Sequence, residues 1–308
     1  MTDGGPRIGI VTGTRAPELT DDGRAVASEL RDRGYEAEPV IWSESGVDWS
    51  RFDGLVVRSC WQYYEDPDAF RAWLGTVERN GVVVVNPPDV IRWNVHKFYL
   101  RDLETAGVSV VPTAYVDRGA DVDLGTVLAR NDWTDAVIKP AIGTSSSGVW
   151  RASTPIGPDA ADRFEAQRAE RDLLVQQFAP EVLDGELSLI FFGGAYSHAN
   201  RSVPADDDFR AHPDFGVSTA AIDPAADLVA QARTVLEAAA NVHSIDPSEL
   251  TYARVDGVER GGSFELIELE LIEPYLGLSR TDGALDRFVD AIDAALCRRS
   301  DSIARALS

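Results

Sequence analysis

Two lysines are the first candidates for chemistry in this chain, because nearly every other cation in it is an arginine. Of the 29 basic residues, only Lys97 and Lys139 are lysines. An ammonium group is a compact point charge, which the planar guanidinium of arginine does not reproduce. Lysines retained in such a background predict a role in binding an anion. We expect Lys97 in the first turn of a helix that begins at Asn94 and ends near Gly107, where the helix dipole favours anions.

A short glycine-bounded loop follows Lys139. Only Ser and Thr residues separate its two glycines, so its backbone N–H groups can approach phosphate oxygens. The loop has half of the P-loop pattern, but Val149-Trp150 replaces the Lys-Ser/Thr pair and a strand is expected next. The sequence therefore disfavours a Walker NTPase, and it leaves open a hairpin loop that covers phosphates or a merely solvated loop. The candidate phosphate-binding residues of this loop are Gly143, Ser145, Ser146, Ser147 and Gly148.

Carboxylates are concentrated between Asp256 and Glu273. In a strand, the side-chain period of two places Glu268 and Glu270 on the same face. Like charges so close together repel unless a cation lies between them, and oxygen ligands of this kind suit Mg²⁺ that is shared with nucleotide phosphates. An exposed acidic face is the alternative in so acidic a protein. The apolar leucines that alternate with these glutamates favour a carboxylate stripe over a cleft.

Three arginines, Arg201, Arg210 and Arg254, lie near these acidic segments. Arg254 and Asp256 share a strand face by the same period of two. Fixed guanidinium groups commonly hold carboxylates or transferring phosphoryl groups. Taken singly, each arginine is better explained as a salt-bridge partner.

Composition limits the partners of the chain. A formal net charge of −22 disfavours nucleic acids and anionic membranes, because a field of that sign repels phosphates. The sequence has no long apolar run and does not begin like a signal peptide, so we expect a cytoplasmic protein. Cys60 and Cys297 show no disulfide or zinc spacing. The acid-rich, lysine-poor composition suggests a halophilic origin, in a cytoplasm where salt screens self-repulsion.

The elements that must position these residues alternate between short apolar runs and helical patterns, which is typical of an α/β fold. We expect residues 1–88 to form a doubly wound parallel domain, with a helix that Asp66 caps and Pro67 begins. The composition changes at Pro87-Pro88, so we place a boundary there and a second domain at 89–308. The strands expected in that domain span 110–111, 115–116, 136–140, 149–151, 173–177, 188–192, 195–200, 252–255 and 264–271. Helices are expected after Asp121, at 225–242 and from 282.

In this order the parts resemble the ATP-grasp superfamily over residues 85–295. The matching parts are Lys97, Val-Ile-Lys139-Pro before the glycine loop, Val175-Gln-Gln-Phe178, Phe209-Arg210, and Asp256 with Glu268-Leu-Glu270. The resemblance implies an ATP-grasp fold, in which two α+β sub-domains grip ATP. It also implies a lid sub-domain near residues 112–175 and identifies the first domain as the one that usually precedes such a fold.

The same resemblance implies roles for individual residues. The two lysines would bind the nucleotide phosphates of ATP, and either Glu181 or Glu186 would bind its ribose. Backbone groups near Gln177 and Phe178 would hold the adenine. Many superfamily members have Asn as the last metal ligand, so the number of metal ions stays open. The implied ligands of Mg²⁺, or of Mn²⁺ in its place, are Asp256, Glu268 and Glu270, and the implied catalytic arginines are Arg210 and Arg254.

Four shorter motifs are most similar to the O-ureido-serine cyclo-ligases of cycloserine biosynthesis and, less closely, to glutathione synthetases. The motifs are Val57-Arg-Ser-Cys-Trp61, Gly185-Glu-Leu-Ser188, Tyr196-Ser-His198 and Glu-Leu-Glu-Leu-Ile-Glu-Pro274. This resemblance implies a C–N ligase that joins a small amino-acid-like carboxylate to an amine through an acyl phosphate. Cyclo-ligase chemistry would make the joining intramolecular, and a homodimer is a family-level expectation. The candidate substrate contacts are Arg58, His198, Arg201 and Glu273.

Two alternatives remain at the level of sequence. Some ATP-grasp proteins are kinases that stop after phosphorylating a small molecule. A non-catalytic nucleotide-binding module is the other alternative, and the retention of both lysines and all the acidic positions argues against it.

Overall fold

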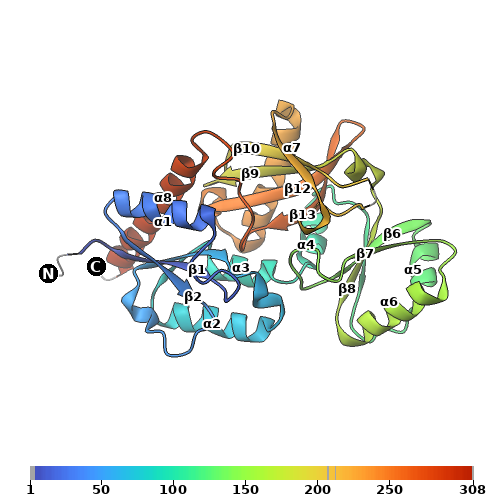
Figure 1. Ribbon diagram of the computed structural model, residues 1–308, viewed down its shortest axis with the longest axis horizontal. Helices are drawn as coiled ribbons and strands as arrows, with labels where there is room; N and C mark the ends of the chain where they lie inside the picture. The colour runs from blue at the N-terminus through green and yellow to red at the C-terminus, as the bar shows by residue number, and fades with distance from the viewer. Residues whose placement is uncertain (1–3, 207, 212, 307–308) are drawn as a thin grey trace.

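Three β-sheets organise the part of the chain that the structure, a computed structural model, describes: residues 4–206, 208–211 and 213–306 (Figure 1). One sheet is parallel and two are antiparallel, so the molecule is a mixed α/β protein. Short 3₁₀ helices connect some of the strands. They are η1 (Trp49–Arg51), η2 (Trp61–Tyr64), η3 (Pro180–Leu183), η4 (Pro213–Phe215) and η5 (Pro247–Glu249).

The first sheet is parallel and has the strand order β2-β1-β3-β4. Strands β1, β3 and β4 are almost wholly buried because helices cover both faces, whereas the edge strand β2 is partly exposed. Helix α2 begins as the sequence predicts, with the Asp66 carboxylate accepting a hydrogen bond from Ala69 N at 3.0 Å. The elements are β1 (Arg7–Thr12), α1 (Asp21–Asp32), β2 (Glu36–Ile41), β3 (Gly54–Ser59), α2 (Pro67–Arg79) and β4 (Val83–Val85).

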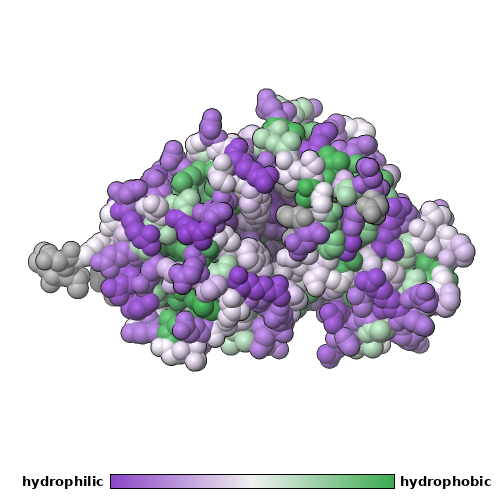
Figure 2. Space-filling model, viewed as in Figure 1, coloured by the Kyte–Doolittle hydropathy of each residue, from purple (hydrophilic) through white to green (hydrophobic). Residues whose placement is uncertain are grey.

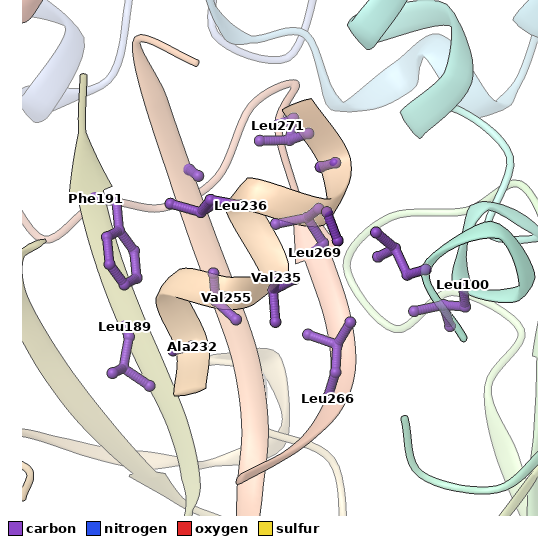
Figure 3. Packing of buried hydrophobic residues seen from close by; sticks show 14 of the residues in the cluster. Leu100, Leu189, Phe191, Ala232, Val235, Leu236, Val255, Leu266, Leu269 and Leu271 are labelled. Carbon is purple, nitrogen blue, oxygen red and sulfur yellow. The ribbon is translucent and has the colours of Figure 1, made fainter. Parts of the chain in front are cut away.

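The second sheet is antiparallel and has the order β11-β10-β9-β12-β13. Its apolar face packs against α7, and in Figure 3 Val235 and Leu236 of that helix lie against Val255 and Leu269 of the sheet. Burying leucine-sized side chains in this way stabilises the fold by about 1.5–3 kcal/mol each. The elements are β9 (Glu186–Phe192), β10 (Ala195–Val203), β11 (Ser218–Ile222), α7 (Ala226–His243), β12 (Tyr252–Arg260) and β13 (Ser263–Glu270).

The third sheet, β5-β8-β6-β7, is antiparallel and carries two helices on one side (Figure 1). The predicted strands at 136–140 and 173–177 are confirmed, and the glycine loop joins β6 to β7. Helix α6 and strands β2 and β11 were not predicted. The elements are β5 (Thr113–Val116), α5 (Leu124–Arg130), β6 (Asp135–Pro140), β7 (Trp150–Ser153), α6 (Pro158–Glu170) and β8 (Leu173–Gln177).

The helix predicted from Asn94 to Gly107 is wrong. The structure has two shorter helices, α3 (Pro88–Asn94) and α4 (Tyr99–Thr105), with Lys97 in the turn between them. Asn94 ends α3 instead of capping a helix, because its buried amide donates to Leu269 O at 2.8 Å and accepts from Leu271 N at 2.9 Å. Long-range contacts with β13 and the residues after it therefore override the local helical pattern.

The C-terminal helix α8 (Ala284–Ala306) returns to the first sheet. Figure 1 shows it beside α1, with both ends of the chain on the same side of the molecule. Phe288 and Ile292 of α8 share a core with Ile10 and Val56 of that sheet. The core on this face of the first sheet thus includes residues from the far end of the chain. Within the described ranges, no helix combines the length and the apolar content that crossing a membrane requires.

Candidate active site

One cavity of about 630 Å³ lies where the three sheets meet. The surface in Figure 2 is hollowed near the middle of the molecule, between the N-terminal domain and the two later sheets. Strand β6 contributes Lys139, β12 contributes Arg254 and the loop after β1 contributes Arg15. Segments far apart in the sequence therefore share a single concave site, as ligand sites between sub-domains commonly do.

Both lysines line this cavity. Lys97 Nζ donates to Gly143 O at 2.9 Å and lies 2.7 Å from Glu268 Oε1. Burial acts to lower the pKa of Lys97, but the carboxylates of Glu268, Glu270 and Glu273 together outweigh it and the pKa is raised. Lys139 Nζ donates to Gln176 Oε1 at 2.8 Å, and burial lowers its pKa despite the nearby carboxylates of Glu268 and Glu186. The hydrogen bond from Lys97 to the glycine loop would let both groups bind the same phosphates.

The acidic residues of β12 and β13 face the cavity as the period of two predicts. Asp256 pairs with Glu268 across the two strands, and Arg254 pairs with Glu270. Arg254 joins this set, because its Nε lies 2.9 Å from Asp256 Oδ1 and its second terminal nitrogen 2.6 Å from Glu270 Oε1. Ser188 Oγ also donates to Asp256 Oδ1, at 2.7 Å.

Burial acts strongly on the acids of the cavity. It raises the pKa of Glu186 to about 8, with the charge of Asp256 as a second cause, and it raises the pKa of Glu273 to about 7. Burial also raises the pKa of Glu270. For Glu268 the neighbouring lysines outweigh burial, so its pKa is lowered. Burial therefore favours the protonated form of these carboxyl groups, which limits the negative charge of the cavity.

An apolar slot forms one wall of the cavity. Its side chains come from the second and third sheets and from the segments that connect them, and they pack into one buried cluster. Gln177 N and Phe178 N donate to Pro112 O at 2.8 Å and Asp135 O at 3.1 Å, so these two N–H groups are not free to bind a base. The residues of the slot that line the cavity are Val111, Val137, Val149, Phe178, Ala179, Val182, Phe209 and Ile267.

The structure places Arg210 at the cavity, within a short irregular segment. Its guanidinium pairs with Asp208 at 2.6 Å and lies over the ring of Phe215, 3.4 Å from the centroid. Ser145 and Ser146, in the glycine loop, also line the cavity and have positive φ angles of 53° and 54°. Gly143 and Ser147 complete the loop lining.

Five of the predicted site residues do not line the cavity. Glu181 forms an ion pair with Arg260 at 3.0 Å, whereas Glu186 lies in the cavity wall. Gly148 packs against Pro140, where an added Cβ would come within 2.9 Å of the proline ring. The remaining three are Arg58, His198 and Arg201.

Arg58 and His198 lie behind the cavity wall, so the prediction that they contact substrate is not supported by their positions. Both are buried and both contact the backbone that follows β13: Arg58 donates to Pro274 O at 2.9 Å, and His198 Nε2 lies 2.8 Å from Leu276 O. The other ring nitrogen of His198 lies 2.9 Å from Ser197 Oγ. Arg201 is exposed on β10 and packs against Gly185. The sequence motifs identified these residues but did not show whether their side chains point into the cavity or away from it.

Several lining residues were missed by sequence reasoning. Gln176 carries a visible signal, because it is a polar residue inside the apolar run of β8. The others come from loops and strand faces whose direction the sequence does not show. They are Arg15, Trp61, Tyr63, Asn94, Ser188, Asn200, Tyr275 and Arg280.

Solved structures with the same architecture are ATP-grasp proteins. The D-alanine–D-alanine ligase from Bacillus anthracis complexed with ATP superimposes with a TM-score of 0.71 at 16% identity, covering 96% of this chain and 99% of that chain. At that identity the similarity shows the fold alone. The chain therefore has the fold that solved ATP-grasp proteins share.

Closer relatives define the family within this class. The family model for the N-terminal domain of D-cycloserine synthetase DcsG matches residues 8–86. The cycloserine biosynthesis protein DcsG of Streptomyces lavendulae is 32% identical over 293 residues, which cover 92% of this chain and 97% of the relative. The crystal structure of D-cycloserine synthetase DcsG superimposes with a TM-score of 0.84 at 31% identity, covering 94% and 99% of the two chains. The chain therefore belongs to the DcsG family of ATP-dependent C–N ligases.

The weaker resemblance to glutathione synthetases is also confirmed. The enzyme of Prochlorococcus marinus subsp. pastoris is 26% identical over 198 residues, covering 60% of this chain and 62% of the relative. The predicted fold class and the prediction of an ATP-grasp ligase are both confirmed by these comparisons.

Proposed function

We propose that this protein uses ATP and Mg²⁺ to convert the carboxylate of a small amino-acid-like substrate into an acyl phosphate, which a nitrogen then attacks. One observation carries the proposal: a single cavity brings Lys97, Lys139 and Arg254 beside the carboxylates of Asp256 and Glu268. Cations that bind phosphoryl groups and acids that bind a divalent metal are the two requirements of phosphoryl transfer.

ATP would lie along the cavity with its base in the apolar slot. Glu186 is the ribose ligand in this arrangement, because it lines the cavity and Glu181 does not. Lys97, Lys139 and the backbone of the glycine loop would then face the phosphates. Lys97 already contacts the loop at Gly143, so one binding event would order both groups.

The residues present fit a magnesium ion by their chemistry. Asp256, Glu268 and Glu270 offer the hard oxygen donors that Mg²⁺ and Mn²⁺ prefer, and all three line the cavity. The described residues hold no cluster of three or more acidic, His or Cys side chains already arranged around a metal site, since these carboxylates pair with Lys97 and Arg254. Phosphate oxygens would have to complete the site, and the bound metal would offset the negative charge of the transferring phosphoryl group.

Arg254 and Arg210 would act at the reacting end. Arg254 is held by two acids on the floor of the cavity, so its position is fixed before substrate binds. Arg210 belongs to a segment without regular structure, and from this segment it would approach the transferring phosphoryl group. Fixed guanidinium donors stabilise charge that develops on phosphoryl and carboxyl oxygens.

The similarity to DcsG suggests the substrate class. The relative is named a D-cycloserine synthetase, so the reaction proposed here is an intramolecular joining that closes a ring, with O-ureido-serine as the first substrate to test. The charged end of the cavity beside Arg15, Tyr275 and Arg280 would bind such a polar molecule.

The proposal is tested with purified protein in concentrated KCl with Mg²⁺, ATP and a panel that begins with O-ureido-serine and extends to other amino acids. Mass spectrometry of the products is combined with assays of ADP and phosphate. The proposal requires ADP, phosphate and a product that has lost water, all absent in Lys139→Met. A stable phosphorylated product would identify a kinase, and nucleotide binding without turnover would support a binding module.

A further inference from the structure

Among the described carboxylates that line the cavity, Glu273 and Glu186 form no hydrogen bond or ion pair, and Glu273 is the one that follows the acidic strand β13. Its side chain is 8% exposed and lines the cavity just beyond the end of β13. No hydrogen bond or ion pair joins it to any other described residue, whereas Asp256, Glu268 and Glu270 are each paired with a cation. Burying a carboxyl group without a partner is costly unless a ligand supplies one.

The backbone around Glu273 is held by buried side chains. Each of them contacts a carbonyl between residues 271 and 276, so the segment is fixed while the Glu273 carboxyl group is left free. Arg58 and His198 therefore act as positioning residues for this segment. The contacts are Asn86 Nδ2 to Leu271 O at 2.9 Å, Tyr252 Oη to Ile272 O at 2.8 Å, Arg58 to Pro274 O at 2.9 Å, and His198 Nε2 to Leu276 O at 2.8 Å.

The surroundings of Glu273 place it at the reacting end of the cavity. Lys97 and Arg254 both attract its charge, and Glu268 repels it. On the side of the N-terminal domain, the charge of Glu273 acts on Cys60 and on Tyr63, which lines the same cavity. Glu273 thus lies between two parts of the cavity wall. One part carries the cations proposed to hold phosphate and carboxylate, and the other part carries Tyr63.

We propose that Glu273 binds the attacking nitrogen of the substrate and accepts its proton. This inference rests on the proposed function. The nitrogen lone pair forms the C–N bond to the acyl carbon, the C–O bond to phosphate breaks, and inorganic phosphate leaves with that electron pair. The N–H proton passes to a carboxylate oxygen of Glu273, so the nitrogen becomes neutral as the product forms.

The carboxyl group is suited to this role by position and by chemistry. Its backbone is held by buried side chains, and its oxygens have no partner among the described residues. Arg254, one of the cations that would hold the acyl phosphate, donates to Tyr275 O at 3.3 Å, two residues beyond Glu273. Burial raises its pKa to about 7, which is where a general base is most effective near neutral pH.

Hydroxylamine separates the two halves of the reaction, because it captures an acyl phosphate as a hydroxamate without using the nitrogen of the substrate. We compare wild type, Glu273→Gln and the surface control Glu36→Gln with O-ureido-serine and MgATP. In Glu273→Gln we expect hydroxamate formation within about threefold of wild type and ring closure lowered by about 100-fold or more, as for loss of a general base. Glu273→Asp should recover part of the ring closure, and Glu36→Gln should match wild type in both assays.

Two results overturn the assignment of Glu273. Ring closure at the wild-type rate in Glu273→Gln would remove the role, and an equal loss of hydroxamate and ring closure would move Glu273 to the activation step. Titration of the variant with a non-hydrolysable MgATP analogue shows that its nucleotide site is folded. If wild type itself forms no hydroxamate, the acyl phosphate of the proposed function fails, which is a different outcome from failure of Glu273 alone.

Discussion

Replacement of Lys139 by Met should weaken nucleotide binding more than any other single loss of positive charge in the third sheet. Lys139 Nζ donates to Gln176 at 2.8 Å, and no other hydrogen bond joins it to the described residues. An ammonium group has three donors, so two remain for phosphate oxygens. Methionine keeps the length of the side chain and removes both donors and the charge.

The expected loss follows from those two donors. A hydrogen bond to a charged group contributes about 1.5–3 kcal/mol. Losing one of them costs about 1.5–3 kcal/mol and losing both about 3–6 kcal/mol, and each 1.4 kcal/mol or so is a factor of about ten in Kd. We therefore expect Kd for the MgATP analogue to rise by roughly 10-fold to 20,000-fold. Gln176 keeps its bond to Thr113 at 3.0 Å, so the fold of β8 should survive.

Isothermal titration calorimetry in concentrated KCl measures this effect directly. Arg171→Met is the matched control. It removes an exposed positive charge that lies just before β8 of the same sheet, at a site outside the cavity. Its Kd should stay within about twofold of wild type, since exposed pairs contribute little. Lys139→Arg tests the reasoning further, because it keeps the charge but changes its shape. If Lys139→Met binds within threefold of wild type, or if Lys139→Arg binds equally well, the argument from lysine retention is refuted.

Two further predictions concern stability. Tyr252→Phe should lower the free energy of unfolding by about 1–3 kcal/mol, because the fully buried hydroxyl contacts the carbonyls of Val57, Val85 and Ile272 across the domain junction. Urea denaturation measures it against Tyr64→Phe, and equal midpoints would contradict it. For Glu186, burial raises the folded-state pKa from 4.5 to about 8, so the folded state binds more protons between those values and loses stability as pH rises. Glu186→Gln should therefore gain stability over wild type progressively from pH 5 to pH 8 in the absence of nucleotide, and a difference that is constant with pH would refute the assignment.

Features set by local pattern could be predicted from the sequence. The period of two predicts that Glu268 shares a strand face with Glu270, and Arg254 with Asp256, and all four side chains line the cavity, because strand geometry alternates side chains whatever the rest of the fold does. Asp66 was predicted as an N-cap for the same kind of reason. The two lysines were identified by residue type, and the structure brings both to one cavity.

Features set by long-range contacts could not be predicted in this way. Asn94 looks like a helix start, but its amide bonds residues far along the chain, at Leu269 and Leu271. Arg58 and His198 were found by motif, yet their buried donors serve the backbone behind the cavity wall. The packing of α8 on the first sheet likewise depends on a partner surface more than 200 residues away in the sequence. Polar residues in apolar runs signal an interaction, but they do not identify the partner.

The charge of the cavity leads to a last prediction about metal and protons. Burial raises the pKa of Glu186 to about 8 and of Glu273 to about 7, and it also raises the pKa of Glu270, so proton binding by these groups near neutral pH depends on the charge that binds beside them. A triphosphate alone adds negative charge and raises their pKa values further, so its binding should take up protons. Mg²⁺ requires ionised ligands, so binding of the complex of Mg²⁺ with the triphosphate should release protons. Titrating the ATP analogue with and without Mg²⁺ in buffers of different ionisation enthalpy measures the sign of proton exchange. A sign that is the same in both cases would show that the metal does not bind at these carboxylates.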